Sequence, residues 1–473
     1  MKKIFLILAT VVGITGCKKL SDLNIDPKNP STAPSYTFFT NAERELANIE
    51  TTSNVNLNIF RLIVQYWQET TYTDESNYLL SYRTINDNEW SVLYSDVLRD
   101  LQETKNLVPN DVTDPELRKN QLAITDFMQV IAWYYLVTTF GNIPYSEGLD
   151  IDKAFPVYDD AKTIYNNLLT RLDGDIANMN TTAGSFGSAD IIYGGDVASW
   201  KRFANSFKLK MGMTIADDDN ARAKATVVSA VMAGVFTSDA DNATFHYLAT
   251  PPNTNPVWVD LVQSGRKDFV AASTIINDMQ NRNDPRLDDY FTLDATGGFS
   301  GGDPGASSNY STYSKPDERL TAADFPHLFL DYSEVEFYLA EAIERGFTVA
   351  GTADEHYNNA VTASILYWGG TTIEATAYLN LASVNYQTAG ATYQEKIGNQ
   401  KWIALYNRGW EAWVEWRRLD YPQLNPALNA VSVIPLRYPY PINEQNVNRL
   451  NYEAASSAIG GDVVATKLWW DKF

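Results

Sequence analysis

The chain has 473 residues, of which 45% are hydrophobic and 20% charged, a composition typical of a globular protein with a sizeable core. Its formal net charge is −21, and no dense run of Lys or Arg follows the N-terminus. This excludes nucleic acid as a partner and predicts a neutral or cationic ligand. Aromatic residues reach 13%, which indicates either extensive core packing or an aromatic-lined binding surface.

The first residues predict a targeting segment. A positive start at residues 1–3 precedes twelve apolar residues at 4–15, too few to span a bilayer, so residues 1–16 are expected to be a cleavable signal peptide. Small residues stand directly before the only cysteine, Cys17, as in a bacterial lipobox. We therefore expect Cys17 to be lipidated and the polar, proline-rich residues 17–34 to form the lipidated N-terminus and tether.

Residues 35–473 are predicted to form a single, mostly α-helical domain, because apolar residues recur at three- and four-residue spacing. One predicted helix has clear ends, with Asp114 as N-cap, Pro115 at the first helical position and Gly141 as the stop. The predicted helices cover residues 35–50, 54–69, 88–108, 114–141, 159–179, 199–217, 221–234, 270–282, 331–347, 353–370 and 391–419.

Residues 236–325 interrupt this pattern as a loop-rich insertion dense in Gly, Pro, Ser, Asn and Asp. Within it, residues 295–316 are predicted to be a long loop, and loops of this length are usually functional or disordered. Proline spacing predicts irregular structure over residues 433–455. At most a small strand pair is expected in these irregular parts.

Two predicted helices within residues 337–365 carry small side chains where they would approach each other, such as Ala340 and Ala360, flanked by large ones such as Phe337 and Tyr357. This arrangement is typical of a TPR-type helical hairpin. Because no regular repeat of about 34 residues is present, the scaffold is expected to consist of degenerate TPR-like hairpins with long irregular loop insertions.

The stretch GWEAWVEWRRLDYPQL (410–425) holds Trp410, Trp413 and Trp416 at three-residue spacing. The three rings fall on one face of a helix, and such a stripe is far more often core than ligand platform. We therefore predict that these tryptophans pack against the scaffold.

Aromatic residues in polar, irregular segments are better candidates for ligand contact. Flat rings beside amide and hydroxyl groups suit a carbohydrate, although each ring could also only cap its own loop. The predicted ligand-binding residues are Tyr72, Tyr78, Trp258, Tyr310 and Tyr313.

Catalytic and metal sites are not predicted. His246, His327 and His356 lack metal-ligand spacing, and no nucleophile-elbow, P-loop or dinucleotide-binding motif occurs. The run at residues 217–219 could hold calcium, but a turn with an N-cap explains it more simply. No cofactor is expected. A glycoside hydrolase with a carboxylate pair across an aromatic cleft stays open as an alternative.

Several stretches in this order resemble the SusD/RagB family of Bacteroidetes surface lipoproteins, and within it the SusD-like group. The resemblance covers nearly the whole chain. It is carried by LSDLNIDPKNP (20–30), YWQETTYTDESNY (66–78), TTFGNIPYSEGL (138–149), GRKDFVAASTIINDMQNRNDPRLDDYF (265–291), YSEVEFYLAEAIERG (332–346), IGNQKWIALYNRGWEAWVEWRRLDYP (397–422) and RYPYPINEQNVN (437–448).

The resemblance implies an α-helical scaffold of four degenerate TPR-like hairpins, anchored by lipid to the outer membrane and facing the cell exterior. It also implies a binding protein rather than an enzyme, which captures oligosaccharide and delivers it to a SusC/RagA-like TonB-dependent transporter. A RagB-like peptide binder is the first alternative, since loop amides such as Asn253, Asn255 and Asn309 could read a peptide backbone. A TPR-like adaptor that binds only another protein is the second.

Overall fold

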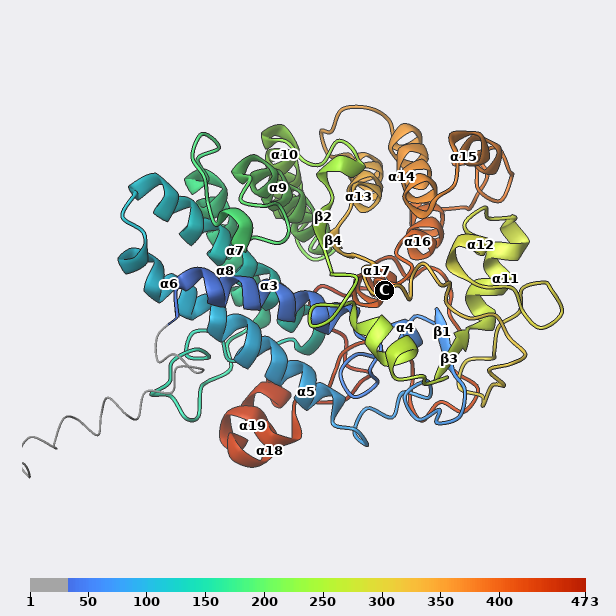
Figure 1. Cartoon of the computed structure of the whole chain (residues 1–473), viewed down its shortest axis with the longest axis horizontal. Coiled ribbons are helices and arrows are strands. Elements are labelled where there is room, and N and C mark those ends of the chain that lie inside the picture. Colours follow the sequence, from blue (N-terminus) through green and yellow to red (C-terminus); the bar gives the residue numbers. More distant parts are fainter. Residues whose placement is uncertain (1–32) are drawn as a thin grey trace, which may run out of the picture.

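The computed structural model describes residues 33–473, so the predicted signal peptide (1–16), Cys17 and all but the last two residues of the predicted tether (17–34) lie outside the described residues. Helices dominate the described part (Figure 1). They are α3 (Ser35–Thr51), α4 (Phe60–Ile63), α5 (Ile85–Ser91), the π-helix η1 (Val92–Leu98), α6 (Arg99–Asp111), α7 (Pro115–Phe140), α8 (Ala161–Asn178), η2 (Gly187–Ala189), α9 (Val197–Thr214), α10 (Asn220–Ala233), η3 (Asp239–Asp241), η4 (Trp258–Gln263), α11 (Ser273–Arg282), α12 (Leu287–Tyr290), α13 (Tyr332–Glu344), α14 (Ala353–Trp368), α15 (Thr372–Leu379), α16 (Tyr393–Ala404), α17 (Gly409–Leu419), α18 (Ile442–Val447) and α19 (Arg449–Ala458).

The longer helices pack as successive pairs: α3 with α6, α7 with α8, α9 with α10, α13 with α14, and α16 with α17. Neighbouring pairs also contact each other, through α6 and α7, α8 and α9, α9 and α13, and α13 and α16. The result is a continuous row of helical hairpins, with α11, α12, β1 and β3 at one end (Figure 1). The predicted fold class, a mostly α-helical hairpin scaffold with loop insertions, is confirmed.

Two short antiparallel strand pairs lie in the irregular parts. β1 (Trp67–Glu69) pairs with β3 (Phe269–Ala271), with Trp67 opposite Ala271, and β2 (Ala243–Phe245) pairs with β4 (His327–Leu330). Each pair joins the loop-rich insertion (236–325) to a strand outside it. The β1–β3 pair thereby fixes where residues 66–72 meet residues 266–271.

Helix ends follow the local chemistry that the sequence indicated. The Asp114 carboxylate accepts hydrogen bonds from the backbone N–H groups of Glu116 and Leu117, Pro115 begins α7, and Gly141 follows its last residue at φ +86°. Glycine accommodates this positive φ without the steric cost that a Cβ atom would bring.

Two helix predictions and one prediction of irregular structure were wrong. Over 54–69, α4 covers only residues 60–63, because Gln65 adopts a left-handed φ of +59° and turns the chain into β1. The helix predicted over 391–419 is broken between α16 and α17, where Asn407 has φ +72°. The irregular structure predicted for 433–455 includes α18 and most of α19.

The tryptophan stripe belongs to the core, as predicted. Trp410 is 2% exposed and Trp413 is fully buried, while Trp416 is partly buried at the edge of the core. The Phe60 ring lies 5.0 Å from the ring centroids of both Trp410 and Trp413, so α4 packs directly on this face of α17. The rings therefore hold the helices together and present no open surface.

The other side of α17 is buried too, and it carries ion pairs. The Lys210 ammonium on α9 lies 3.2 Å from Glu334 of α13 and 3.7 Å from Glu411 of α17, and the Arg408 guanidinium donates to Glu334 at 2.5 Å. Burial alone would raise the pKa of Glu334, but the positive charges of Lys210 and Arg408 outweigh it and lower this pKa to about 2. The carboxylate is therefore ionised inside the protein.

A second group of buried charges centres on Arg418. Its guanidinium donates to both oxygens of Glu341 on α13, at 2.5 and 2.6 Å, and to Glu415 one turn earlier at 2.6 Å. Glu415 also accepts from Lys401 of α16 at 2.8 Å. Although burial acts to raise it, the charges of Arg418 and Lys401 hold the pKa of Glu415 well below its ordinary value. This cluster joins α13, α16 and α17.

Arg418→Met is expected to lower the free energy of unfolding by about 3–5 kcal/mol, because it leaves buried Glu341 and Glu415 short of a cation. Urea unfolding followed by circular dichroism measures the loss. The matched control is Arg449→Met on α19, which removes an exposed pair with Glu453 and should leave stability unchanged. Equal effects of the two substitutions would contradict the role given to the buried cluster.

Candidate ligand-binding cleft

A surface cleft lies beside the β1–β3 pair. It consists of two adjoining hollows of about 260 Å³ each, which share Val55, Arg83, Arg266, Asp268 and Phe269. The first hollow is also lined by residues 69–72, and the second by residues 53–56 and 259–260. Segments more than 200 residues apart in the sequence thus form one site.

Backbone hydrogen bonds around Thr70 hold the walls of the cleft. Its N–H donates to the Asp268 carbonyl at 2.8 Å, and its hydroxyl donates to the Lys267 carbonyl at 2.7 Å. The Thr70 carbonyl accepts from the Ser307 hydroxyl and the Ser308 N–H, both at 2.8 Å. The long loop 295–316 is therefore fastened to the edge of the cleft.

The second hollow is closed by η4. Asp260 on this π-helix accepts hydrogen bonds from the Thr52 hydroxyl at 2.9 Å and from the Ser53 N–H at 3.0 Å. π-helical turns often occur at functional sites. Here the turn brings Val259 and Asp260 to the cleft wall.

Of the sequence-predicted residues, Tyr72 lines the cleft directly and is 69% exposed. Tyr310 is half-buried next to the cleft, and the ammonium group of the lining residue Lys267 lies 5.6 Å from the Tyr310 ring centroid. Trp258 is half-buried and immediately precedes the lining residue Val259, and Tyr313 is half-buried in the loop that borders the cleft. The ligand contacts of these residues stay predictions.

Tyr78 lies beneath the surface. It is 2% exposed, and its hydroxyl accepts a hydrogen bond from the Ala427 N–H at 3.2 Å. Its φ of +68° is a left-handed conformation, uncommon for a residue with a Cβ atom. The ring thus supports the loop from below. Asn255 is likewise buried, and its amide donates to the Phe325 carbonyl at 2.7 Å.

The charged residues of the cleft were not predicted as site residues. Arg83, Arg266 and Lys267 line it, and two of them lie in GRKDF (265–269), a segment whose basic pair sits inside an irregular insertion. In the sequence, the basic pair Arg266–Lys267 next to aromatic residues was the signal that could have identified these site residues. Arg83 is separated from it by more than 180 residues, so only the fold brings it to the same place.

Two acidic side chains meet under the cleft. Glu69 is 4% exposed and accepts from the Ser76 N–H at 2.8 Å, while buried Glu75 is paired with the Arg83 guanidinium. Burial raises the pKa of Glu69 to about 9, helped by a hydrogen bond with Glu75 and by its charge. Glu69 is therefore protonated at neutral pH. Because the two carboxyl groups are in direct contact, they lack the separation of at least about 5 Å that glycoside hydrolysis uses.

Residues 33–473 lack two features, a metal-ligating cluster and a membrane-crossing helix. No group of three or more His, Cys, Asp or Glu side chains that could hold a metal ion occurs there. The run at 217–219 is occupied by the protein itself, since Asp217 pairs with Arg345, Asp218 with Lys162, and Asp219 caps α10. Over the same residues, no helix has the length and apolar character needed to cross a membrane.

A scaffold of helical hairpins that carries an aromatic and charged surface cleft is typical of a ligand-binding protein. The family model SusD-like, described as "Starch-binding associating with outer membrane", matches residues 27–441, and the chain belongs to this family.

Solved structures agree with this assignment. The chain is similar to a chitin-binding protein (TM-score 0.81, 27% identity, 93% of this chain and 100% of that chain) and to a SusD homologue from Bacteroides uniformis (TM-score 0.76, 27% identity, 92% and 100%). A chitin-binding SusD homologue from Flavobacterium johnsoniae shares the fold (TM-score 0.79, 23% identity, 93% and 98%). No curated protein matches the sequence significantly.

Glu69→Gln is expected to change how stability depends on pH. Between pH 4.5, the ordinary value, and about 9, folded Glu69 keeps a proton that the unfolded chain has released, so the wild type loses stability as pH rises. Gln mimics the protonated acid and has no such proton to lose. The stability of the variant relative to the wild type should therefore increase from about pH 5 to about pH 8 in urea unfolding. A difference that stays constant with pH would contradict this assignment.

Proposed function

We propose that this protein is a lipid-anchored, surface-exposed binding protein that captures oligosaccharide in the cleft beside β1 and β3 and passes it to a TonB-dependent outer-membrane transporter. The single observation that carries the proposal is the meeting of exposed Tyr72 with Arg83, Arg266 and Asp268 in one cleft. An aromatic ring can stack on a sugar face while charged side chains hydrogen-bond its hydroxyls.

Glycan is favoured over peptide by the family description and by the similarity to a chitin-binding protein. The amide of Asn255, one of those that a peptide could have used, is engaged within the protein. Tyr72, Trp258, Tyr310 and Tyr313 are the proposed contacts, whereas Tyr78 is buried and is left out. The action is binding without chemical turnover.

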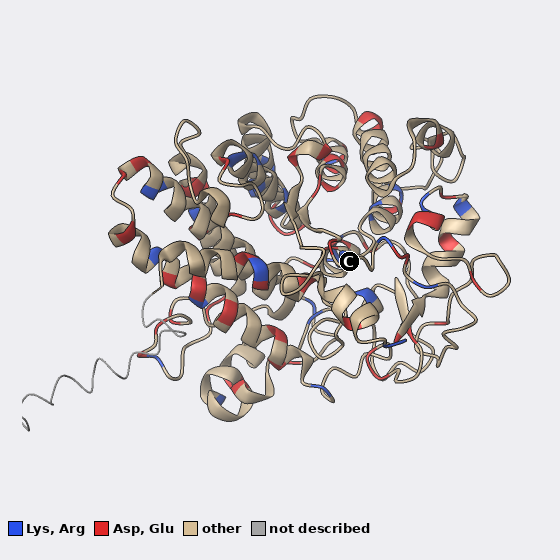
Figure 2. Cartoon of the chain, in the orientation of Figure 1, with Lys and Arg blue, Asp and Glu red and all other residues tan. Residues whose placement is uncertain are grey.

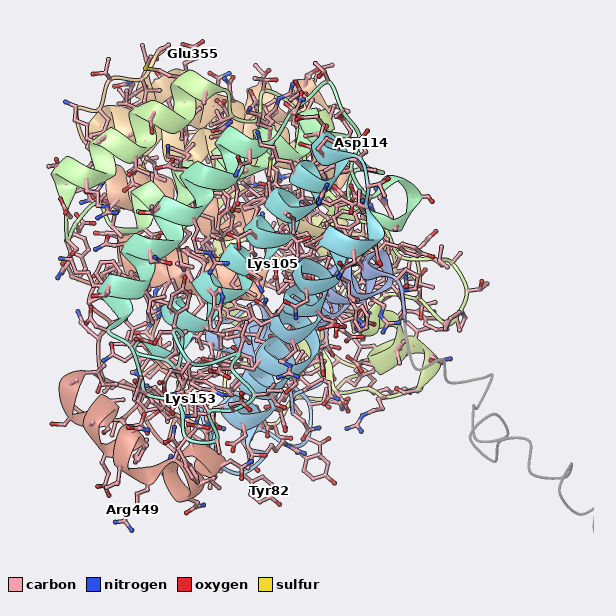
Figure 3. All side chains as sticks on the ribbon, turned by 90° about the vertical axis from the view of Figure 1, so that its left-hand side faces the viewer. Tyr82, Lys105, Asp114, Lys153, Glu355 and Arg449 are labelled. Carbon is pink, nitrogen blue, oxygen red and sulfur yellow. The ribbon has the colours of Figure 1, made fainter. Side chains whose placement is uncertain are left out.

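A surface suited to the transporter lies elsewhere on the chain. The Asn448 side chain donates to the Pro156 carbonyl at 2.8 Å and the Asn451 side chain to the Phe155 carbonyl at 3.1 Å, so the loop before α8 and helix α19 form one surface. Lys153 and Arg449 mark this edge of the molecule in Figure 3. Its exposed apolar side chains, which suit a protein partner, are Ile151, Phe155, Val157, Val447 and Leu450.

Tyr72→Ala and Trp258→Ala should each weaken binding of malto- or chito-oligosaccharides by roughly three- to tenfold, the worth of one aromatic contact. Isothermal titration calorimetry of the protein without its lipid anchor measures this. The matched control is Tyr36→Ala, which removes another exposed tyrosine at the start of α3. Unchanged affinity in both cleft variants would overturn the site, as would a loss confined to the control.

Leu450→Asp is expected to reduce co-purification of the transporter from outer-membrane extracts, because it puts a charge into an apolar contact. Met232→Asp, at an equally exposed apolar position on α10 (84% against 83%), is the matched control and should leave the complex intact. If neither substitution changed the yield of transporter, the proposed docking surface would be wrong.

A further inference from the structure

The charge of the whole chain and the charge of the cleft differ. Asp and Glu are spread over most of the helical scaffold (Figure 2), in keeping with the net charge of −21. The cleft instead gathers Arg83, Arg266 and Lys267 from two distant segments. Lys315, at the base of the loop 295–316, approaches the same Tyr310 ring as Lys267. A local basic group on an acidic protein is a feature that composition does not explain.

The acids near the cleft are already engaged by the protein. Glu75 pairs with Arg83, and Asp268 pairs with the Arg266 guanidinium at 2.5 Å. Asp260 accepts from Thr52 and Ser53. The Glu69 carboxyl, held against Glu75, is neutral at neutral pH. These four acids are therefore paired or hydrogen-bonded within the protein, or neutral, and none of them pairs with Lys267 or Lys315.

Both lysines converge on one ring. The Lys267 ammonium lies 5.6 Å and the Lys315 ammonium 5.3 Å from the Tyr310 ring centroid, and neither forms an ion pair with a carboxylate of residues 33–473. The π-face of Tyr310 attracts each of the two cations.

The buried ring of Tyr338 also has two cations nearby, but there a carboxylate pairs with both of them. Lys401 and Arg418 lie 3.2 and 5.7 Å from its centroid, and there Glu415 accepts hydrogen bonds from both cations. At Tyr310, no carboxylate within residues 33–473 pairs with either lysine, and Lys267 is exposed to solvent.

The backbones that carry the two lysines are held in place. The Lys267 carbonyl accepts from the Thr70 hydroxyl at 2.7 Å, and Lys315 exchanges two hydrogen bonds with Thr292, at 2.9 and 3.2 Å. The main-chain positions from which both lysine side chains reach Tyr310 are therefore fixed.

Resting on the proposed glycan-binding function, we infer that Lys267 and Lys315 beside Tyr310 bind an acidic group, a carboxylate or a sulfate, carried by the oligosaccharide. The ligand class is then an anionic glycan, such as one with uronic acid or sulfated sugars. This departs from the neutral or cationic ligand that the net charge predicts, because an ionic contact depends on the charges within a Debye length, about 8 Å at physiological salt, and not on the total.

Calorimetry with size-matched oligosaccharides tests the inference: one uronic acid-containing, one sulfated and one neutral. At least one acidic ligand should bind roughly tenfold or more tightly than the neutral one, as expected for charge-assisted hydrogen bonds, and added salt should weaken that preference. Lys267→Gln combined with Lys315→Gln should abolish the preference. Whether the uronate or the sulfated ligand binds more tightly identifies the source of the anion.

The matched control is Lys396→Gln, which removes a single lysine 4.7 Å from the Tyr386 ring on another part of the scaffold and should keep the preference for acidic ligands. Equal affinity for acidic and neutral ligands, or an unchanged preference in the double variant, would overturn the inference. If the neutral ligand still bound in a Tyr72-dependent way, the proposed function would survive that result. Absence of binding by every oligosaccharide would overturn both.

Discussion

The buried charges around α17 are the constraint on which the rest of the structure depends. Glu411, Glu415 and Arg418 leave this helix on the side away from its tryptophans and meet Lys210, Glu341 and Lys401 from three other helices. Each buried ion needs an opposite charge close by, because an unpaired charge in the interior is very costly. These ion pairs link the hairpins α9–α10, α13–α14 and α16–α17 and favour the arrangement in which the opposite charges meet.

This rigid body gives the irregular segments a fixed platform. Loops that run over a surface cannot bury much apolar area, so their positions depend on hydrogen bonds to the scaffold and to each other. Thr70 shows how this works, since its backbone and hydroxyl tie β1 to residues 267–268 and to the loop 295–316. Binding residues on such loops are held near the geometry that a ligand needs, which lowers the entropy lost on binding.

Local and global electrostatics separate in this molecule. The acidic scaffold keeps the net charge strongly negative, whereas the cleft uses its carboxylates within the protein and leaves its lysines to an incoming group. A neutral Glu69 under the cleft is part of this arrangement, because an ionised carboxylate there would offset one of the cations. In the proposed complex, the lysines bind the acidic group of the sugar while the neighbouring aromatic rings stack on its faces.

Local pattern was enough to predict most of the scaffold. Periodic apolar residues and capping side chains, such as Asp114 before Pro115, act within a few residues, so the sequence by itself determined the helical class, most helix boundaries and the core position of Trp410 and Trp413. The same reasoning singled out Tyr72 as a loop aromatic, and the fold brings it to the cleft.

Only the tertiary structure decided the rest. The buried position of Tyr78, the break at Asn407 and the left-handed turn at Gln65 depend on contacts with distant segments, and periodicity carries no information on them. The meeting of Arg83 with Arg266, and of Lys267 with Lys315 around Tyr310, depends on how separate loops fold onto one platform. Sequence spacing determines local geometry. The residues of a binding site come from separate segments, and only tertiary packing brings those segments together.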